Sequence, residues 1–144
     1  MSKGNNLLNS PAANFQARVS SVLNRNTKEF GKKYLFDGKE DTCWNSDQGS
    51  PQWIQVTFQD SVQTITELQL MFQGGFAGKN CTIEVCKKDK EEFIKCQDFY
   101  PEDSNKLQKF QLPEPVSGQS FKIVFTNSTD FFGRITVYQM NLIS

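Results

Sequence analysis

A carboxylate pair, a Ser-Lys arrangement or a metal would have to carry any hydrolytic chemistry of this sequence, because the 144 residues include no histidine. Without histidine, Ser-His and Cys-His nucleophile pairs and imidazole ligands for zinc are excluded. Glu102 and Asp103 are neighbours beside Pro101, and carboxylates in such loops usually cap turns rather than act as an acid–base pair. We therefore predict that the protein is not an enzyme.

One acidic and oxygen-rich segment, DGKEDT at residues 37–42, has the composition of a calcium-binding loop. Calcium takes about six to eight oxygen ligands, including backbone carbonyls, from loops of this kind. Asp37, Asp41 and Thr42 are the candidate ligands of a structural Ca²⁺. The other interpretation is a plain turn in which Asp37 caps the backbone that follows it. No other cofactor is expected.

Aromatic residues recur in three segments that fall where strands should end and turns begin. Phenylalanine within a strand needs no explanation, but phenylalanine in a loop rich in Gly or Asp does, because exposed apolar patches often mark partner surfaces. Aromatic residues and arginine also dominate the binding energy of protein interfaces. The alternative is that these rings close the ends of the fold and that the arginine locks a loop. The predicted partner-binding residues are Phe76, Phe99, Tyr100, Phe131, Phe132 and Arg134.

Short alternating segments, separated by turn-forming clusters, must position these loops. In residues 52–58, Ile54, Val56 and Phe58 share one face of an expected strand. Further strands are predicted at residues 17–23, 62–72, 81–86, 93–99, 107–112, 119–126 and 134–143. In the last of these the apolar phase shifts after Val137, which predicts a β-bulge. The pattern predicts an all-β fold, a jelly-roll sandwich of about eight strands.

The chain is formally neutral, with 16 Lys and Arg side chains against 16 Asp and Glu side chains. A neutral balance argues against direct binding of nucleic acid, which normally shows a basic excess. The absence of a run of about 18 apolar residues argues against a membrane span. The first residues lack the pattern of a signal peptide, so we do not expect secretion. We expect a flexible tail over residues 1–16 and one domain over residues 17–144.

The order LFDGKEDTCWNSDQGSPQWIQVTF, FQGGFAG and a final strand resembles the discoidin or coagulation factor C-type domain family. The resemblance covers about residues 17–143 and implies a galactose-binding-like jelly roll. It also implies an alternative function, a glycan- or ligand-binding module. This chain lacks a cysteine pair at its two ends. It has Gln139 and Asn141 where calcium-binding relatives use an acidic side chain, which lowers the expected calcium affinity.

The stretches SSVLNRNTKEFGKKYLFD, DFYPED and TDFFGR resemble a narrower group within this family, small proteins that associate with an orphan nuclear receptor. This resemblance implies a protein–protein interaction module that binds the receptor and represses its transcriptional activity. It further implies a protein that acts in the nucleus and the cytoplasm. None of these functional expectations follows from composition or strand spacing.

Overall fold

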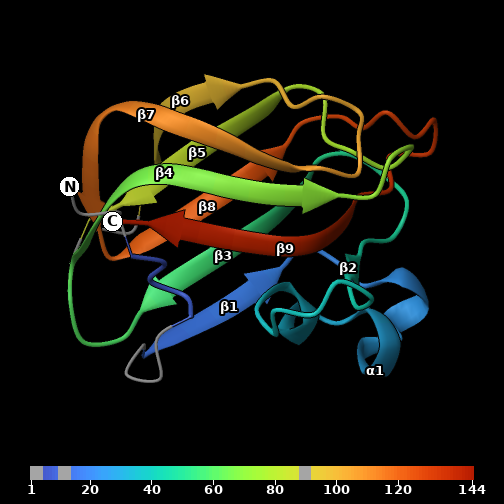
Figure 1. The fold of residues 1–144 in the computed structure, drawn as a ribbon, viewed down its shortest axis with the longest axis horizontal. Helices are drawn as coiled ribbons and strands as arrows, with labels where there is room; N and C mark the ends of the chain where they lie inside the picture. Colours follow the sequence, from blue (N-terminus) through green and yellow to red (C-terminus); the bar gives the residue numbers. More distant parts are fainter. Residues whose placement is uncertain (1–4, 10–13, 88–91) are drawn as a thin grey trace.

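The computed structural model describes residues 5–9, 14–87 and 92–144, which form two antiparallel sheets packed face to face (Figure 1). One sheet has the order β1 (Phe15–Val19), β3 (Gln52–Phe58), β8 (Ser120–Phe125), β5 (Cys81–Cys86), β6 (Ile94–Phe99). The other has the order β2 (Trp44–Asn45), β9 (Thr136–Ile143), β4 (Gln63–Phe72), β7 (Leu107–Gly118). The predicted all-β jelly-roll sandwich is confirmed.

Three short helical segments connect β1 to β2: η1 (Leu23–Arg25), α1 (Thr27–Phe30) and η2 (Lys32–Leu35). The side chain of Asn26 caps α1 by accepting a hydrogen bond of 3.2 Å from the Glu29 N–H. Leu35 is fully buried and fixes η2 against the core. This connection therefore lies against the sandwich as a packed unit.

Aromatic side chains fill the space between the two sheets. Phe121 and Phe125 alternate inward along β8, the middle strand of its sheet. Phe125 packs edge-to-face on Phe72 from the opposite sheet, with ring centroids 5.7 Å apart. Trp44 is fully buried, and its indole N–H donates to the Ser21 carbonyl at 2.9 Å. The many phenylalanines of the sequence therefore serve mainly as core.

The predicted bulge in the last strand is present. Phe72 pairs with Val137, whereas the preceding Met71 pairs with Gln139, so that Tyr138 is left over between the two pairs. An extra residue in one strand is the definition of a β-bulge. The apolar phase shift in the sequence reports this change of register.

Strand β7 is longer than predicted, because it continues past residue 112 to Gly118. The segment contains Pro113 and Pro115, which the sequence pattern treats as the end of a strand. At the edge of a sheet, however, a proline can face away from the partner strand, where no N–H is needed. β7 is such an edge strand, with β4 as its neighbour in the sheet. Residues 112–115 also form a bulge between the pairs Ile65–Val116 and Glu67–Gln111, so the two prolines interrupt no pair of the ladder.

Part of the segment that we expected to be a flexible tail, residues 1–16, packs against the last strand. Asn6 forms an isolated bridge with Ile143, and the Leu7 N–H donates to the Leu142 carbonyl at 2.8 Å. Leu8 is 5% exposed and belongs to the core cluster. Residues 1–4 and 10–13 of that segment lie outside the described residues.

Raising the pH is expected to destabilise the fold through the free thiol of Cys81. This side chain is buried, and burial raises its pKa from an ordinary 9.0 to about 12. In the unfolded chain the thiol ionises near 9.0, so its stabilising contribution is complete below that pH and is lost as the pH rises toward 12. The slope is at most about 1.4 kcal/mol per pH unit.

Urea unfolding of the wild type and of Cys81→Ala over this alkaline range measures the effect. The free energy of unfolding should fall more steeply with pH in the wild type than in the variant. Parallel curves would show that the thiol does not remain protonated in the folded protein.

Candidate functional site

Four loops gather at the end of the sandwich opposite the two chain termini (Figure 1). They are residues 46–51, 73–80, 100–106 and 126–135, which we call the loop end. The loops follow strands from both sheets, so the stacking of the sheets brings them together. All of the predicted partner-binding residues lie in these loops or next to them.

Loop 100–106 is tied to loop 73–80 by side chains that accept hydrogen bonds from backbone. The Asp103 carboxylate accepts from the Gly75 N–H at 2.7 Å, and Asn105 Oδ1 accepts from the Gly74 N–H at 2.6 Å. Asp103 also accepts a longer hydrogen bond of 3.4 Å from the Thr129 hydroxyl. Asp103 therefore has the capping role expected of a loop carboxylate, but it caps a neighbouring loop.

Loop 126–135 is attached to two further loops. Thr129 Oγ1 accepts from the Ala77 N–H at 3.0 Å, and the Thr129 N–H donates to the Ala77 carbonyl at 2.8 Å. The Phe132 carbonyl accepts from the Gly49 N–H at 2.8 Å. Gly133 has a φ of +85°, and a Cβ there would lie 2.7 Å from the Gly49 carbonyl oxygen. Glycine is therefore required where this loop crosses loop 46–51.

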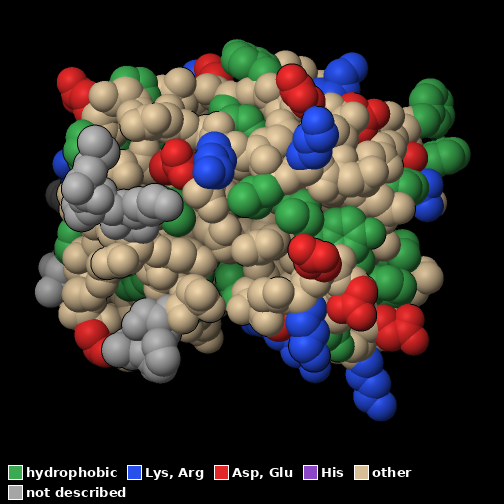
Figure 2. Space-filling view, in the orientation of Figure 1, with side chains coloured by type: hydrophobic (Ala, Val, Ile, Leu, Met, Phe, Trp, Pro, Cys, Tyr) green, Lys and Arg blue, Asp and Glu red, His purple; other side chains and the backbone are tan. Residues whose placement is uncertain are grey.

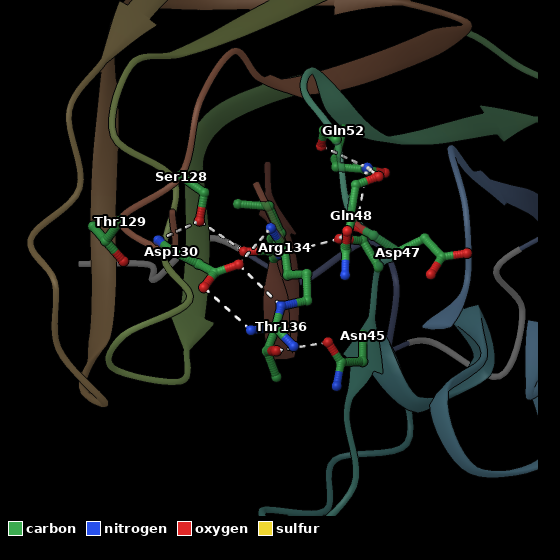
Figure 3. A network of polar contacts seen from close by, with 12 residues as sticks. Asn45, Asp47, Gln48, Gln52, Ser128, Thr129, Asp130, Arg134 and Thr136 are labelled. Atoms are coloured by element: carbon green, nitrogen blue, oxygen red, sulfur yellow. Dashed lines mark hydrogen bonds and ion pairs between the residues drawn. The ribbon is translucent and has the colours of Figure 1, made fainter. Parts of the chain in front are cut away.

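An ion pair locks loop 126–135 from within (Figure 3). Arg134 Nε lies 3.0 Å from Asp130 Oδ2, and Arg134 Nη2 lies 3.3 Å from Asp130 Oδ1, so the pair is bidentate. The Asp130 carboxylate also accepts a hydrogen bond from the Arg134 backbone N–H. The Ser128 hydroxyl accepts from the Asp130 N–H and donates to the Arg134 carbonyl. The side chains are only 11% and 31% exposed for Asp130 and Arg134. The pair is therefore shielded and structural.

The guanidinium of Arg134 also holds two aromatic rings. Its central carbon lies 5.2 Å from the Phe76 ring centroid and 5.7 Å from that of Phe132. Arg134 thus connects loop 73–80 with loop 126–135. The structure gives this arginine the loop-locking contacts that were the alternative interpretation of the sequence.

Three rings project from the loop end into solvent. Phe131 is 93% exposed, Tyr100 is 67% exposed and Phe132 is 54% exposed. Figure 2 shows hydrophobic side chains protruding from this end of the molecule. Among the described residues the other exposed large hydrophobic side chains are Val62 and Ile94, so exposed apolar surface is concentrated here.

Phe99 does not belong to this exposed set, contrary to the prediction from its position beside Tyr100 and Pro101. It is the last residue of β6, is 5% exposed and packs on Phe110 with ring centroids 4.6 Å apart. Strand alternation explains the difference, because Phe99 and Tyr100 point to opposite faces. Phe76 is half-buried beneath Arg134.

The candidate calcium ligands lie between η2 and β2, in a segment that is not one of the four loops of the loop end. Asp37 Oδ1 accepts from the Lys39 N–H at 2.9 Å, and Asp37 Oδ2 accepts from the Thr42 hydroxyl at 2.6 Å. These are the hydrogen bonds of the turn interpretation. Asp41 is exposed. In residues 5–9, 14–87 and 92–144, no three His, Cys, Asp or Glu side chains group as metal ligands.

Replacing Asp130 with asparagine is expected to loosen loop 126–135 without unfolding the core. Hydrogen bonds from Arg134 lower the pKa of Asp130 below its ordinary 3.8, so its stabilising contribution is present at neutral pH and is lost as the pH falls through the lowered pKa. Amide hydrogen exchange of residues 128–134 should accelerate about tenfold at neutral pH. Asp98→Asn, which removes the exposed Lys95–Asp98 pair, is the control. Unchanged exchange in Asp130→Asn would contradict a locking role.

The chain belongs to the F5/8 type C domain family, because the model of that family matches residues 16–137. The fold is similar to chitosan-binding module 1 of a chitosanase/glucanase from Paenibacillus sp. IK-5. The TM-score is 0.76 at 21% identity, over 97% of this chain and 99% of that module. No helix in the described part of the chain has the length and hydropathy needed to cross a membrane.

Within this class the chain is similar to a particular group of proteins. It is 56% identical to nuclear receptor 2C2-associated protein of Xenopus laevis over 127 residues. These residues make up 88% of this chain and 91% of the relative. The protein of the same name in Danio rerio is 54% identical over 128 residues, 89% of each chain. The narrower resemblance seen in the sequence is confirmed.

Proposed function

We propose that this chain is a non-enzymatic protein–protein interaction module that binds nuclear receptor 2C2 and represses its transcriptional activity. Relatives that are 56% and 54% identical carry the name of this association. The structural observation that supports the proposal is the loop end. There Tyr100, Phe131 and Phe132 are exposed on loops that side-chain hydrogen bonds and an ion pair hold together.

Aromatic rings on loops that are tied together are suited to binding for a thermodynamic reason. An interface must order its side chains, which costs free energy, and rings on loops already tied to one another lose less freedom on binding. Phe131 and Phe132 also contact each other edge-to-face, with centroids 5.3 Å apart. Repression follows if the bound module covers the receptor surface that contacts DNA or the second receptor subunit.

The module acts by contact alone in this proposal. The sequence has no histidine. Two carboxylates of the loop end, those of Asp103 and Asp130, are engaged in hydrogen bonds to backbone and to Arg134. The module works as a monomer in the nucleus and the cytoplasm and contacts neither nucleic acid nor membrane.

Glycan binding is the second candidate function, and one feature favours it. A hollow of about 510 Å³ is lined by three polar side chains, one thioether and one aromatic ring, those of Glu40, Gln73, Asn105, Met71 and Tyr138. Such a mixture of an apolar platform and a few polar groups is typical of small-ligand sites. The hollow borders loops 73–80 and 100–106 of the loop end.

Calorimetric titration of purified receptor into the purified chain, beside a receptor-driven reporter in cells, tests the proposal. Saturable binding and a lower reporter signal in the presence of the chain are expected. No heat of binding between two folded proteins would contradict it. A glycan array probed with the same preparation distinguishes the second candidate, which requires a signal there.

A further inference from the structure

Positive charge is concentrated in one stretch of an otherwise neutral chain. Residues 18–33 contain five cationic side chains, Arg18, Arg25, Lys28, Lys32 and Lys33, and one acidic side chain, Glu29. Five cations and one acid give this stretch a net charge of +4. Because the whole chain is neutral, the remaining residues carry a net charge of −4. All five cations are exposed. Figure 2 shows Lys and Arg side chains projecting from the region of α1.

Within the described part of the chain, no ion pair neutralises these cations. The ion pairs of the described residues are Lys95–Asp98 and Arg134–Asp130, and neither includes a residue of this stretch. Lys33 lies over the Tyr34 ring, with its ammonium 5.1 Å from the centroid, a contact that leaves its charge in place. Like charges that line one groove repel one another, so the stretch favours an anionic partner.

A groove of about 440 Å³ runs between β1 and the α1–η2 segment, and three of these cations border it. Arg18 lines it from β1, and Lys32 and Lys33 line it from η2. Val19 and Val22 supply apolar lining, and both are partly buried against the core. The groove thus combines an apolar lining with a cationic border.

The groove is built by fixed backbone. Gly31, which also lines it, is buried between α1 and η2, and a Cβ there would lie 2.5 Å from the Thr27 carbonyl oxygen. The Tyr34 hydroxyl donates to the Lys28 carbonyl, which ties η2 back to α1. These contacts hold the backbone of Lys32 and Lys33 at the border before any ligand binds, so binding requires no ordering of this segment's backbone.

We propose that this groove binds a short acidic peptide segment of a partner protein, with one apolar side chain of that segment seated against Val19 and Val22. The cationic border favours an anionic ligand, and the apolar lining favours a peptide with an apolar side chain over a bare phosphate. The net negative charge of the rest of the chain disfavours a long polyanion such as duplex DNA, which would extend beyond the groove. This site is separate from the loop end and does not depend on the proposed function.

Fluorescence anisotropy with a labelled peptide of Asp and Glu around a central Leu tests the proposal. The wild type should bind it, and Lys32→Glu/Lys33→Glu should weaken binding at least about tenfold. Lys106→Glu/Lys109→Glu makes the same change of net charge on exposed lysines in and before β7 and should bind like the wild type. Far-ultraviolet circular dichroism establishes that both variants fold.

Two further probes test the specificity of the groove. A peptide with Ser in place of the central Leu should bind more weakly to the wild type, and this difference should shrink in Val22→Ser. The proposal is overturned if the wild type does not bind the Leu peptide, or if both charge variants weaken binding equally. It is also overturned if the Ser peptide binds as well, or if duplex DNA or phosphatidylserine vesicles bind more tightly than the peptide.

Discussion

Replacing Phe131 and Phe132 together with alanine is expected to weaken binding to nuclear receptor 2C2 by about 2 kcal/mol or more, roughly a 30-fold rise in Kd. The reason is that the two rings contact each other and are largely exposed in the free chain. Truncation therefore removes apolar area that the proposed complex buries. The fold should be unaffected, because neither ring belongs to the core cluster. Calorimetry measures Kd, and urea unfolding measures stability.

A matched control removes exposed apolar side chains elsewhere. Val62 and Ile94 are 46% and 57% exposed and lie outside the loop end. The double variant Val62→Ala/Ile94→Ala should bind the receptor as the wild type does. Equal binding by the Phe131/Phe132 variant and this control would remove the two rings from the interface.

The second large effect concerns the core beneath the loops. Phe125→Ala is expected to reduce the free energy of unfolding by about 3–5 kcal/mol. Phe125 is 1% exposed, contacts Phe72 and Trp44, and lies close under Gly78, where a Cβ would approach its ring to 2.8 Å. The cavity would therefore open at the junction of both sheets and loop 73–80. Such a loss is a large share of a typical total of about 5–15 kcal/mol.

Urea unfolding monitored by tryptophan fluorescence measures this loss directly. Phe110→Ala is the comparison, because Phe110 is half-buried near the sheet edge and should cost less. A smaller loss for Phe125→Ala than for Phe110→Ala would show that the space around Phe125 can close after truncation.

The central strands were predictable because burial and alternation agree there. β3 has the predicted bounds, and every second residue from Gln52 to Phe58 is buried. The phase shift near Tyr138 also has a local cause, the bulge against β4. The end of β7 was not predictable in this way, since Pro113 and Pro115 are tolerated because they lie in a bulge of an edge strand, between the pairs Ile65–Val116 and Glu67–Gln111. Edge position depends on the whole topology.

The candidate site was predictable in its residue types and not in its contacts. Tyr100, Phe131 and Phe132 are exposed as their turn-rich surroundings indicate, whereas Phe99, one residue away from Tyr100, is core. Sequence reasoning named Arg134 as a residue that could lock a loop, but it missed the contacts by which Asp103 and Thr129 tie one loop to another. Asp103 bonds Gly75, which lies 28 residues earlier in the chain, so no local pattern reports the contact. Asp130 and Arg134 are four residues apart, and this spacing was the one signal available.

Amide hydrogen exchange of the chain, alone and bound to nuclear receptor 2C2, tests most directly whether the aromatic loop end is the binding surface. The prediction is slower exchange on binding in residues 100–106 and 126–135, with little change in residues 59–62 at the end near the termini. If exchange in residues 100–106 and 126–135 is no slower in a complex shown to be saturated, the result would contradict the account.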